Sequence, residues 1–160
     1  MKKIIPFSLF ESVEENDNTG KTEKIDNKTF GGFKSDIEKD TIENINFRKV
    51  LYTGKNLQLV LMSLKPGEEI GAEIHHDNDQ FFRFEDGKGK VVIDENEYKV
   101  KNGDAVVIPA GAKHNVINTG KDELKMYTIY APPHHKDGIL RATKRDAESN
   151  KEEFDGKTTE

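Results

Sequence analysis

The sequence predicts an all-β fold, a barrel or a sandwich, and three observations support this prediction. Short strand-like segments alternate with turn residues throughout residues 46–131. No helical hydrophobic period of useful length interrupts this block. The chain has 160 residues, which is about the length of one domain. We therefore expect a single β domain built from the central part of the chain.

The chain divides by composition into three parts. Residues 1–45 are interpreted as an N-terminal arm and linker, and Phe30 and Phe33 suggest that its end docks on the body or on a partner chain. Residues 46–135 form the β block. Residues 136–160 form a polar C-terminal helix and tail.

Nine strands are expected in the β block, each bounded by turn residues. Asn102-Gly103 is a strong hairpin signal between two of them, because a type I′ turn needs positive φ at both central positions. The predicted strands are 47–53, 57–64, 70–76, 80–84, 90–93, 97–100, 105–108, 114–118 and 124–130. After them, Thr143 and Asp146 form a capping box for a short helix that runs toward Phe154.

Composition excludes several classes of function. The chain has 25 Lys and Arg against 30 Asp and Glu, a net charge of −5, which gives no electrostatic footprint for nucleic acid or an anionic membrane. It has no cysteine, so disulfides, a thiolate nucleophile and cysteine-ligated metals are excluded. No signal peptide or membrane-spanning apolar run is recognisable. We expect a cytoplasmic protein.

Polar side chains with metal-binding chemistry gather in residues 71–80. Glu73 and His75 share one face of a strand, about 7 Å apart at Cα, whereas His76 points to the other face. If the next strand pairs antiparallel with this one, Gln80 returns to the side of Glu73 and His75. A register slip by one residue would put His76 in the place of His75.

A second segment with a regular spacing follows, Gly103, Pro109, Gly111, His114 and Asn118. With these residues, the chain resembles the cupin family over about residues 46–131, and the family's second motif is matched at every position. In the place of the family's first motif the chain has Glu73-x-His75, Gln80 and Gly87. The resemblance implies a small β-barrel of the jelly-roll type, with a divalent metal in its mouth.

The first motif departs from the family pattern at two positions. The family places histidine where this chain has Glu73, and glutamate where it has Gln80, so the implied ligands are Glu73, His75, Gln80 and His114. An amide oxygen in place of one imidazole makes the site harder, which favours manganese or iron, with zinc, nickel and cobalt still possible. The alternative is a metal-free, hydrogen-bonded polar cluster.

Two further residues are candidates for a role in the site. Phe82 shares the face of Gln80, so it is either a core residue or a substrate platform near the metal. His135 follows the last strand, where it either reaches the mouth as an acid or base or lies exposed on a Pro-rich loop.

The cupin resemblance implies a metal-dependent enzyme with Lewis-acid chemistry of the isomerase or lyase type. The substrate would be a small polar molecule, such as a sugar or a keto acid, and small chains of this kind are similar to mannose-6-phosphate isomerase. An iron-dependent dioxygenase and a non-catalytic binding module are the alternatives. Cupins commonly pair, so a homodimer is expected, with the arm adding a strand to the partner's sheet.

Overall fold

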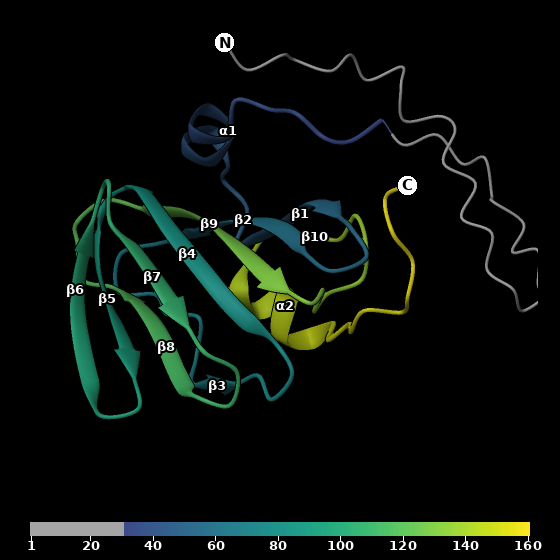
Figure 1. Ribbon diagram of the computed structural model, residues 1–160. Helices are drawn as coiled ribbons and strands as arrows, with labels where there is room; N and C mark the ends of the chain where they lie inside the picture. The colour runs from purple at the N-terminus through teal and green to yellow at the C-terminus, as the bar shows by residue number, and fades with distance from the viewer. Residues whose placement is uncertain (1–30) are drawn as a thin grey trace, which may run out of the picture. The chain divides into compact units, whose positions relative to one another are not determined.

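The computed structural model describes residues 31–160. The part of the predicted arm before residue 31, with Phe30, lies outside the described residues. The described chain is mostly β, as predicted, with a short helix near each end (Figure 1). The elements are α1 (Ile37–Glu43), β1 (Arg48–Thr53), β2 (Gln58–Leu64), β3 (Glu73–Ile74), β4 (Asp79–Asp86), β5 (Lys88–Ile93), β6 (Asn96–Lys101), β7 (Ala105–Ile108), β8 (Lys113–Asn118), β9 (Leu124–Ala131), β10 (Leu140–Arg141) and α2 (Lys144–Ser149).

Two antiparallel sheets face each other in a jelly-roll arrangement (Figure 1). The larger sheet has the order β10-β1-β2-β9-β4-β7, and the smaller has the order β3-β8-β5-β6. Alternating side chains of each strand meet between the sheets; along β4, for example, Phe82 and Phe84 are fully buried while Phe81 and Arg83 are only half-buried. The core lies between the sheets.

The predicted hairpin at Asn102-Gly103 is wrong. β6 pairs with β5 and β7 pairs with β4, so this turn carries the chain from one sheet to the other. Gly103 has a φ of 92°, but Asn102 is not among the residues with positive φ, so the type I′ turn is not formed. Instead, the amide of Gly103 donates to the carbonyl of Phe84 at 2.9 Å, because burying both strands inside the barrel outweighs the local turn preference.

Two short elements were not predicted, and one predicted strand is shorter than expected. The predicted strand at 70–76 is reduced to β3, and β10 has only two residues. Helix α1 begins after Asp36, whose carboxylate accepts from the amide of Lys39, and it packs on β2, β4 and β9. It was missed because seven residues with one buried side chain, Thr41, show no hydrophobic period.

The last third of the predicted arm, residues 31–45, belongs to the body of the protein. Besides α1, residues 31–45 include Phe33, whose ring stacks on that of Tyr52 at 5.5 Å between centroids. The docking predicted for Phe33 is therefore confirmed, on the same chain.

The C-terminal segment returns to the barrel. Thr143 caps α2 by accepting from the amide of Asp146 at 3.1 Å, as predicted, but the helix ends at Ser149 and does not reach Phe154. Beyond it, the amide of Phe154 donates to the carbonyl of His134 and the amide of Thr159 donates to the carbonyl of Thr53, each at 2.9 Å. The predicted solvated tail is thus bonded to the barrel. Among the described residues, no helix has the length and apolar character needed to cross a membrane.

Candidate metal centre

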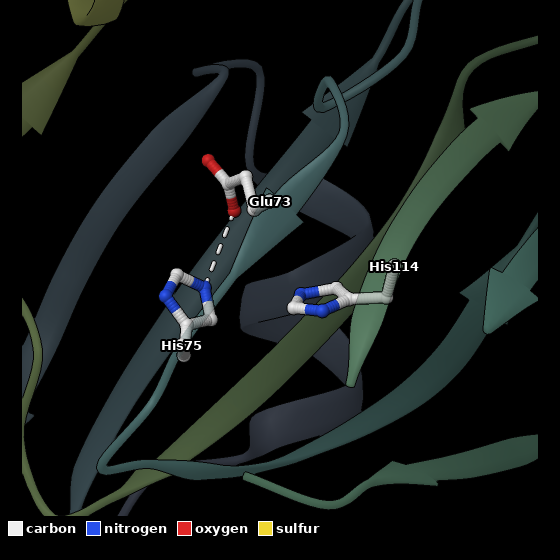
Figure 2. A group of neighbouring side chains, drawn as sticks. All are labelled: Glu73, His75 and His114. Atoms are coloured by element: carbon white, nitrogen blue, oxygen red, sulfur yellow. Dashed lines mark ion pairs between the residues drawn. The ribbon is translucent and has the colours of Figure 1, made fainter. Parts of the chain in front are cut away.

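Strand pairing brings the two sequence motifs together. β3 pairs antiparallel with β8, and this register places Glu73 directly opposite His114. Residues opposite each other in a ladder share a face, and His75 follows two residues after Glu73. The turn before β8 holds the chain there, because the amide of Gly111 donates to the carbonyl of His75 at 2.8 Å. Figure 2 shows the three side chains converging from these two segments.

The three side chains form a compact donor group. One ligand atom from each of Glu73, His75 and His114 lies within 4.8 Å of the others. Nε2 of His75 lies 3.3 Å from a carboxylate oxygen of Glu73 (Figure 2). Donors about 2.0–2.2 Å from one ion are separated by about 3–4.4 Å, so this spacing fits a shared cation with small adjustments. His76, by contrast, is exposed, so the register-slip alternative is wrong.

One nitrogen of His114 is left without a partner. Its Nδ1 lies 3.0 Å from the carbonyl oxygen of Ala112, which fixes the tautomer with the proton on Nδ1. The lone pair on Nε2 is then available, and this buried atom has no hydrogen-bond partner within the described part of the chain. An unsatisfied buried polar atom costs about 1–3 kcal/mol. The residues therefore fit a bound cation, which would satisfy it.

The environment holds these groups in the form that binds a cation. Burial raises the pKa of Glu73, but the contact with His75 and the charges of His75, Arg48 and His114 outweigh it, so its pKa lies below the usual value. Burial lowers the pKa of His114, against the opposing hydrogen bond to Ala112. At neutral pH the site thus offers a carboxylate and a neutral imidazole.

Gln80 lies in the other sheet, so the strand pairing expected for it is wrong. β4 pairs with β7 and β9, and not with β3. The side chain is nevertheless buried, and its Nε2 donates to Oγ1 of Thr128 at 3.0 Å. Its Oε1 has no hydrogen-bond partner among the residues that the structure describes. The amide oxygen is thus unoccupied, and Gln80 stays a predicted ligand.

A cavity of about 340 Å³ opens beside the donor group. Glu73 and His75 form part of its wall, together with Arg48 of β1 and the pair His134 and His135. Side chains of α2 and of the segment after it complete the lining: Lys144, Ala147, Glu148, Lys151, Glu152 and Glu153. The C-terminal part of the chain therefore closes one side of the cavity.

His135 is buried, so its interpretation as an exposed loop residue is wrong. It is 5% exposed and packs edge-on against Tyr130, with 5.0 Å between ring centroids. Burial lowers its pKa well below the usual value. His134 lies 4.2 Å from His75 between centroids, and burial together with the charge of His75 lowers its pKa to about 4. Both histidines are neutral at pH 7.

Phe82 lies in the core. It has no exposed surface, stacks on Phe84 at 6.2 Å between centroids, and is not part of the cavity wall. The structure thus favours the core interpretation over a substrate platform.

Sequence reasoning missed Arg48 and His134 in the cavity wall, and it missed Tyr130, whose ring packs edge-on against His75 at 5.7 Å between centroids. Arg48 could have been found, because it shares the buried face of its predicted strand with Val50, and an inward-facing charge is unusual. No local signal marks Tyr130 or His134, since their place depends on how the last strand meets the C-terminal segment.

Comparison with known proteins agrees with the fold. The pattern of the cupin domain matches residues 60–130. The chain is 47% identical over 121 residues to YrkC of Bacillus subtilis, a match that covers 72% of this chain and 65% of that protein. It is 43% identical over 108 residues to L612 of Acanthamoeba polyphaga mimivirus, covering 65% of this chain and 68% of that protein.

A solved structure is also similar. The crystal structure of BH2720 from Bacillus halodurans superposes with a TM-score of 0.73 at 44% identity, covering 74% of this chain and 94% of that one. Sequence motifs, sheet topology and relatives agree, and the chain belongs to the cupin family.

Proposed function

We propose that this protein is a metal-dependent cupin in which Glu73, His75 and His114 hold a divalent ion, with Gln80 as a fourth ligand. The observation that supports this most strongly is the partnerless, buried Nε2 of His114, facing a carboxylate and a second imidazole within 4.8 Å. Glu73 and His75 lie 3.3 Å apart, as a metal-free polar cluster would also allow. Such a cluster would pair the third group as well, and His114 Nε2 has no hydrogen bond among the described residues.

We further propose that the protein acts on a small polar molecule in the adjoining cavity, by isomerase- or lyase-type chemistry. A bound divalent ion would supply a Lewis acid there. One carboxylate, two imidazoles and an amide oxygen favour manganese or iron over zinc, nickel or cobalt. With iron, the alternative is an oxygen-dependent reaction.

The protein's own groups limit which acid–base roles are open. His134 and His135 line the cavity and are neutral at pH 7, so they can accept or pass on a proton but hold none to give as imidazolium. A base with a pKa of about 4, as for His134, is weak. The second candidate is a binding module without catalysis, for which the cavity and the metal centre suffice without an acid–base group.

Elemental analysis tests the metal site. Protein stripped with a chelator, reloaded with Mn²⁺ and desalted should contain about one ion per chain. The double variant His75→Ala/His114→Ala should contain none, because it lacks both imidazoles. His76→Ala is the matched control: it removes an exposed neighbouring histidine and should keep its metal. A parent protein that takes up no metal would refute the proposed function.

A further inference from the structure

Arg48 points a charge into the barrel. On β1 it lies directly opposite Met62 of β2, and Val50 lies opposite Val60. Met62 and Val60 have no exposed surface, and residues opposite each other in a ladder share a face. The guanidinium of Arg48 therefore belongs to the inner face of the larger sheet, where apolar side chains are the rule.

This guanidinium has no direct ion pair among the described residues, although its neighbour has one; the charge of Arg48 acts on Glu73 only at longer range. Arg141 lies opposite Arg48 on β10 and forms an ion pair with Glu152. Within residues 31–160, no carboxylate lies within 4 Å of Arg48, and its Nε is buried without a hydrogen bond. The guanidinium carbon lies 5.7 Å from the ring centroid of Phe47, a contact that holds it in place.

An unpaired charge at this place opposes folding. Two like charges directly opposite in a sheet repel each other. Arg48 is only partly buried, but its Nε is buried without a hydrogen bond, which is costly. Arg48 also lies in the wall of the cavity that contains Glu73 and His75. One small ligand in about 340 Å³ can therefore touch both the guanidinium and the metal centre.

We propose that Arg48 is the anion-binding residue of this cavity and that the ligand is a small carboxylic acid. Its carboxylate would sit on the guanidinium of Arg48, and a second oxygen would face Glu73 and His75. The inference rests on the proposed function for that second contact. It narrows the proposed substrates to molecules with a carboxylate, such as keto acids, and excludes neutral sugars.

The rest of the wall favours a carboxylate over a phosphate. A guanidinium presents a planar fork that matches the two oxygens of a carboxylate. Nζ of Lys144 lies 3.8 Å from a carboxylate oxygen of Glu148, and Lys151 is a second lysine in the wall. The wall thus carries three cations, Arg48, Lys144 and Lys151, against the four carboxylates of Glu73, Glu148, Glu152 and Glu153. This excess of negative charge disfavours a phosphate dianion more than a singly charged carboxylate.

Calorimetry of the Mn²⁺-loaded full chain tests this proposal. The probes are pyruvate, lactate and malonate, each beside its neutral amide, and inorganic phosphate. The parent should bind at least one acid more tightly than its amide and than phosphate. Arg48→Met should lower the affinity for that acid by about 10- to 100-fold, as expected for a lost charge-assisted hydrogen bond. Lys49→Met, which removes a cation from the next position on the strand, should change the affinity less than about twofold.

Three results of the calorimetry would overturn the proposal: acids that bind no better than their amides, phosphate that binds most tightly, or an affinity that is unchanged in Arg48→Met. Mn²⁺ content is measured separately and should be unchanged in Arg48→Met. If the parent protein binds no Mn²⁺, the proposed function is refuted but the anion-binding role of Arg48 is not. Titration of the metal-free chain with the same acids then still tests that role.

Thermal unfolding separates binding from a structural role. Arg48→Met removes an unpaired charge, so its melting temperature should equal or exceed that of the parent. Arg141→Met breaks the ion pair with Glu152 and should melt lower. A melting temperature for Arg48→Met as low as that of Arg141→Met would make Arg48 structural and overturn the proposal.

Discussion

At the scale of single residues, the site consists of groups whose surroundings fix their chemical state. The carbonyl of Ala112 fixes the tautomer of His114, and the opposing strand places Glu73 beside it. Glu73, His75 and His114 could be predicted from the sequence, because the motif spacing and the alternation of a strand determine which side chains share a face. Arg48 could have been noted as an inward-facing charge, but neither its place in the cavity wall nor that of His134 could be predicted, because a wall formed by distant segments leaves no local pattern.

The buried state of His135 predicts a pH dependence of stability. Its pKa in the folded protein lies well below 6.5, the ordinary value that it takes in the unfolded chain. At a pH between these two pKa values, His135 binds a proton in the unfolded chain but not in the folded protein. The free energy of unfolding should therefore fall as the pH drops below about 6.5, by up to about 1.4 kcal/mol per pH unit for this group. The decrease should end below the pKa of the folded state.

Urea unfolding at pH 7.5 and pH 5 measures this effect. His135→Gln should lose less stability on acidification than the parent, because it takes up no proton. His76→Gln, at an exposed position, should behave like the parent. An identical decrease in the parent and in His135→Gln would show that His135 is not held neutral by the fold.

At the scale of elements, some positions of the two motifs contribute side chains to the site, and others hold the surrounding loops in place. Asn118 closes the second motif, and its Nδ2 donates to the carbonyls of Leu64 and Asp122 at 2.8 Å, so it fastens a loop. Strand positions could be predicted because alternation is strong, whereas strand partners could not. The turn at Asn102-Gly103 determines where the chain reverses, but the competition among all strands for the barrel interior determines pairing.

Gly87, the last position of the first motif, should be intolerant of any side chain. It has a φ of 85°, and a Cβ there would lie 2.4 Å from the carbonyl oxygen of Glu123. Gly87→Ala combines backbone strain with a clash against backbone, so we expect a loss of more than about 2 kcal/mol in the free energy of unfolding.

Gly67→Ala is the matched control for Gly87→Ala. Gly67 has a φ of 76° and open space around it, so the substitution should cost only the strain, about 1 kcal/mol. Denaturant unfolding of both variants gives the comparison. Equal losses of unfolding free energy in the two variants would show that the close approach to Glu123 does not contribute to the cost of Gly87→Ala.

At the scale of the whole molecule, the barrel and the C-terminal segment together define the cavity. The sheets supply Arg48, Glu73 and His75, while α2 and the residues after it cover one side. This closure could not be predicted, because residues 150–160 have the composition of a solvated tail and are held by backbone hydrogen bonds to His134 and Thr53. Residues 31–45 belong to the same compact unit as the barrel. The homodimer stays a prediction.

The central claim is that two imidazoles and one carboxylate of a single site hold a divalent ion. Pulsed electron paramagnetic resonance of the Mn²⁺-loaded chain counts the nitrogens bound to the ion. We predict couplings from two imidazole nitrogens in the parent, and from one in His114→Gln. An ion without nitrogen couplings, or a spectrum unchanged in His114→Gln, would contradict the account.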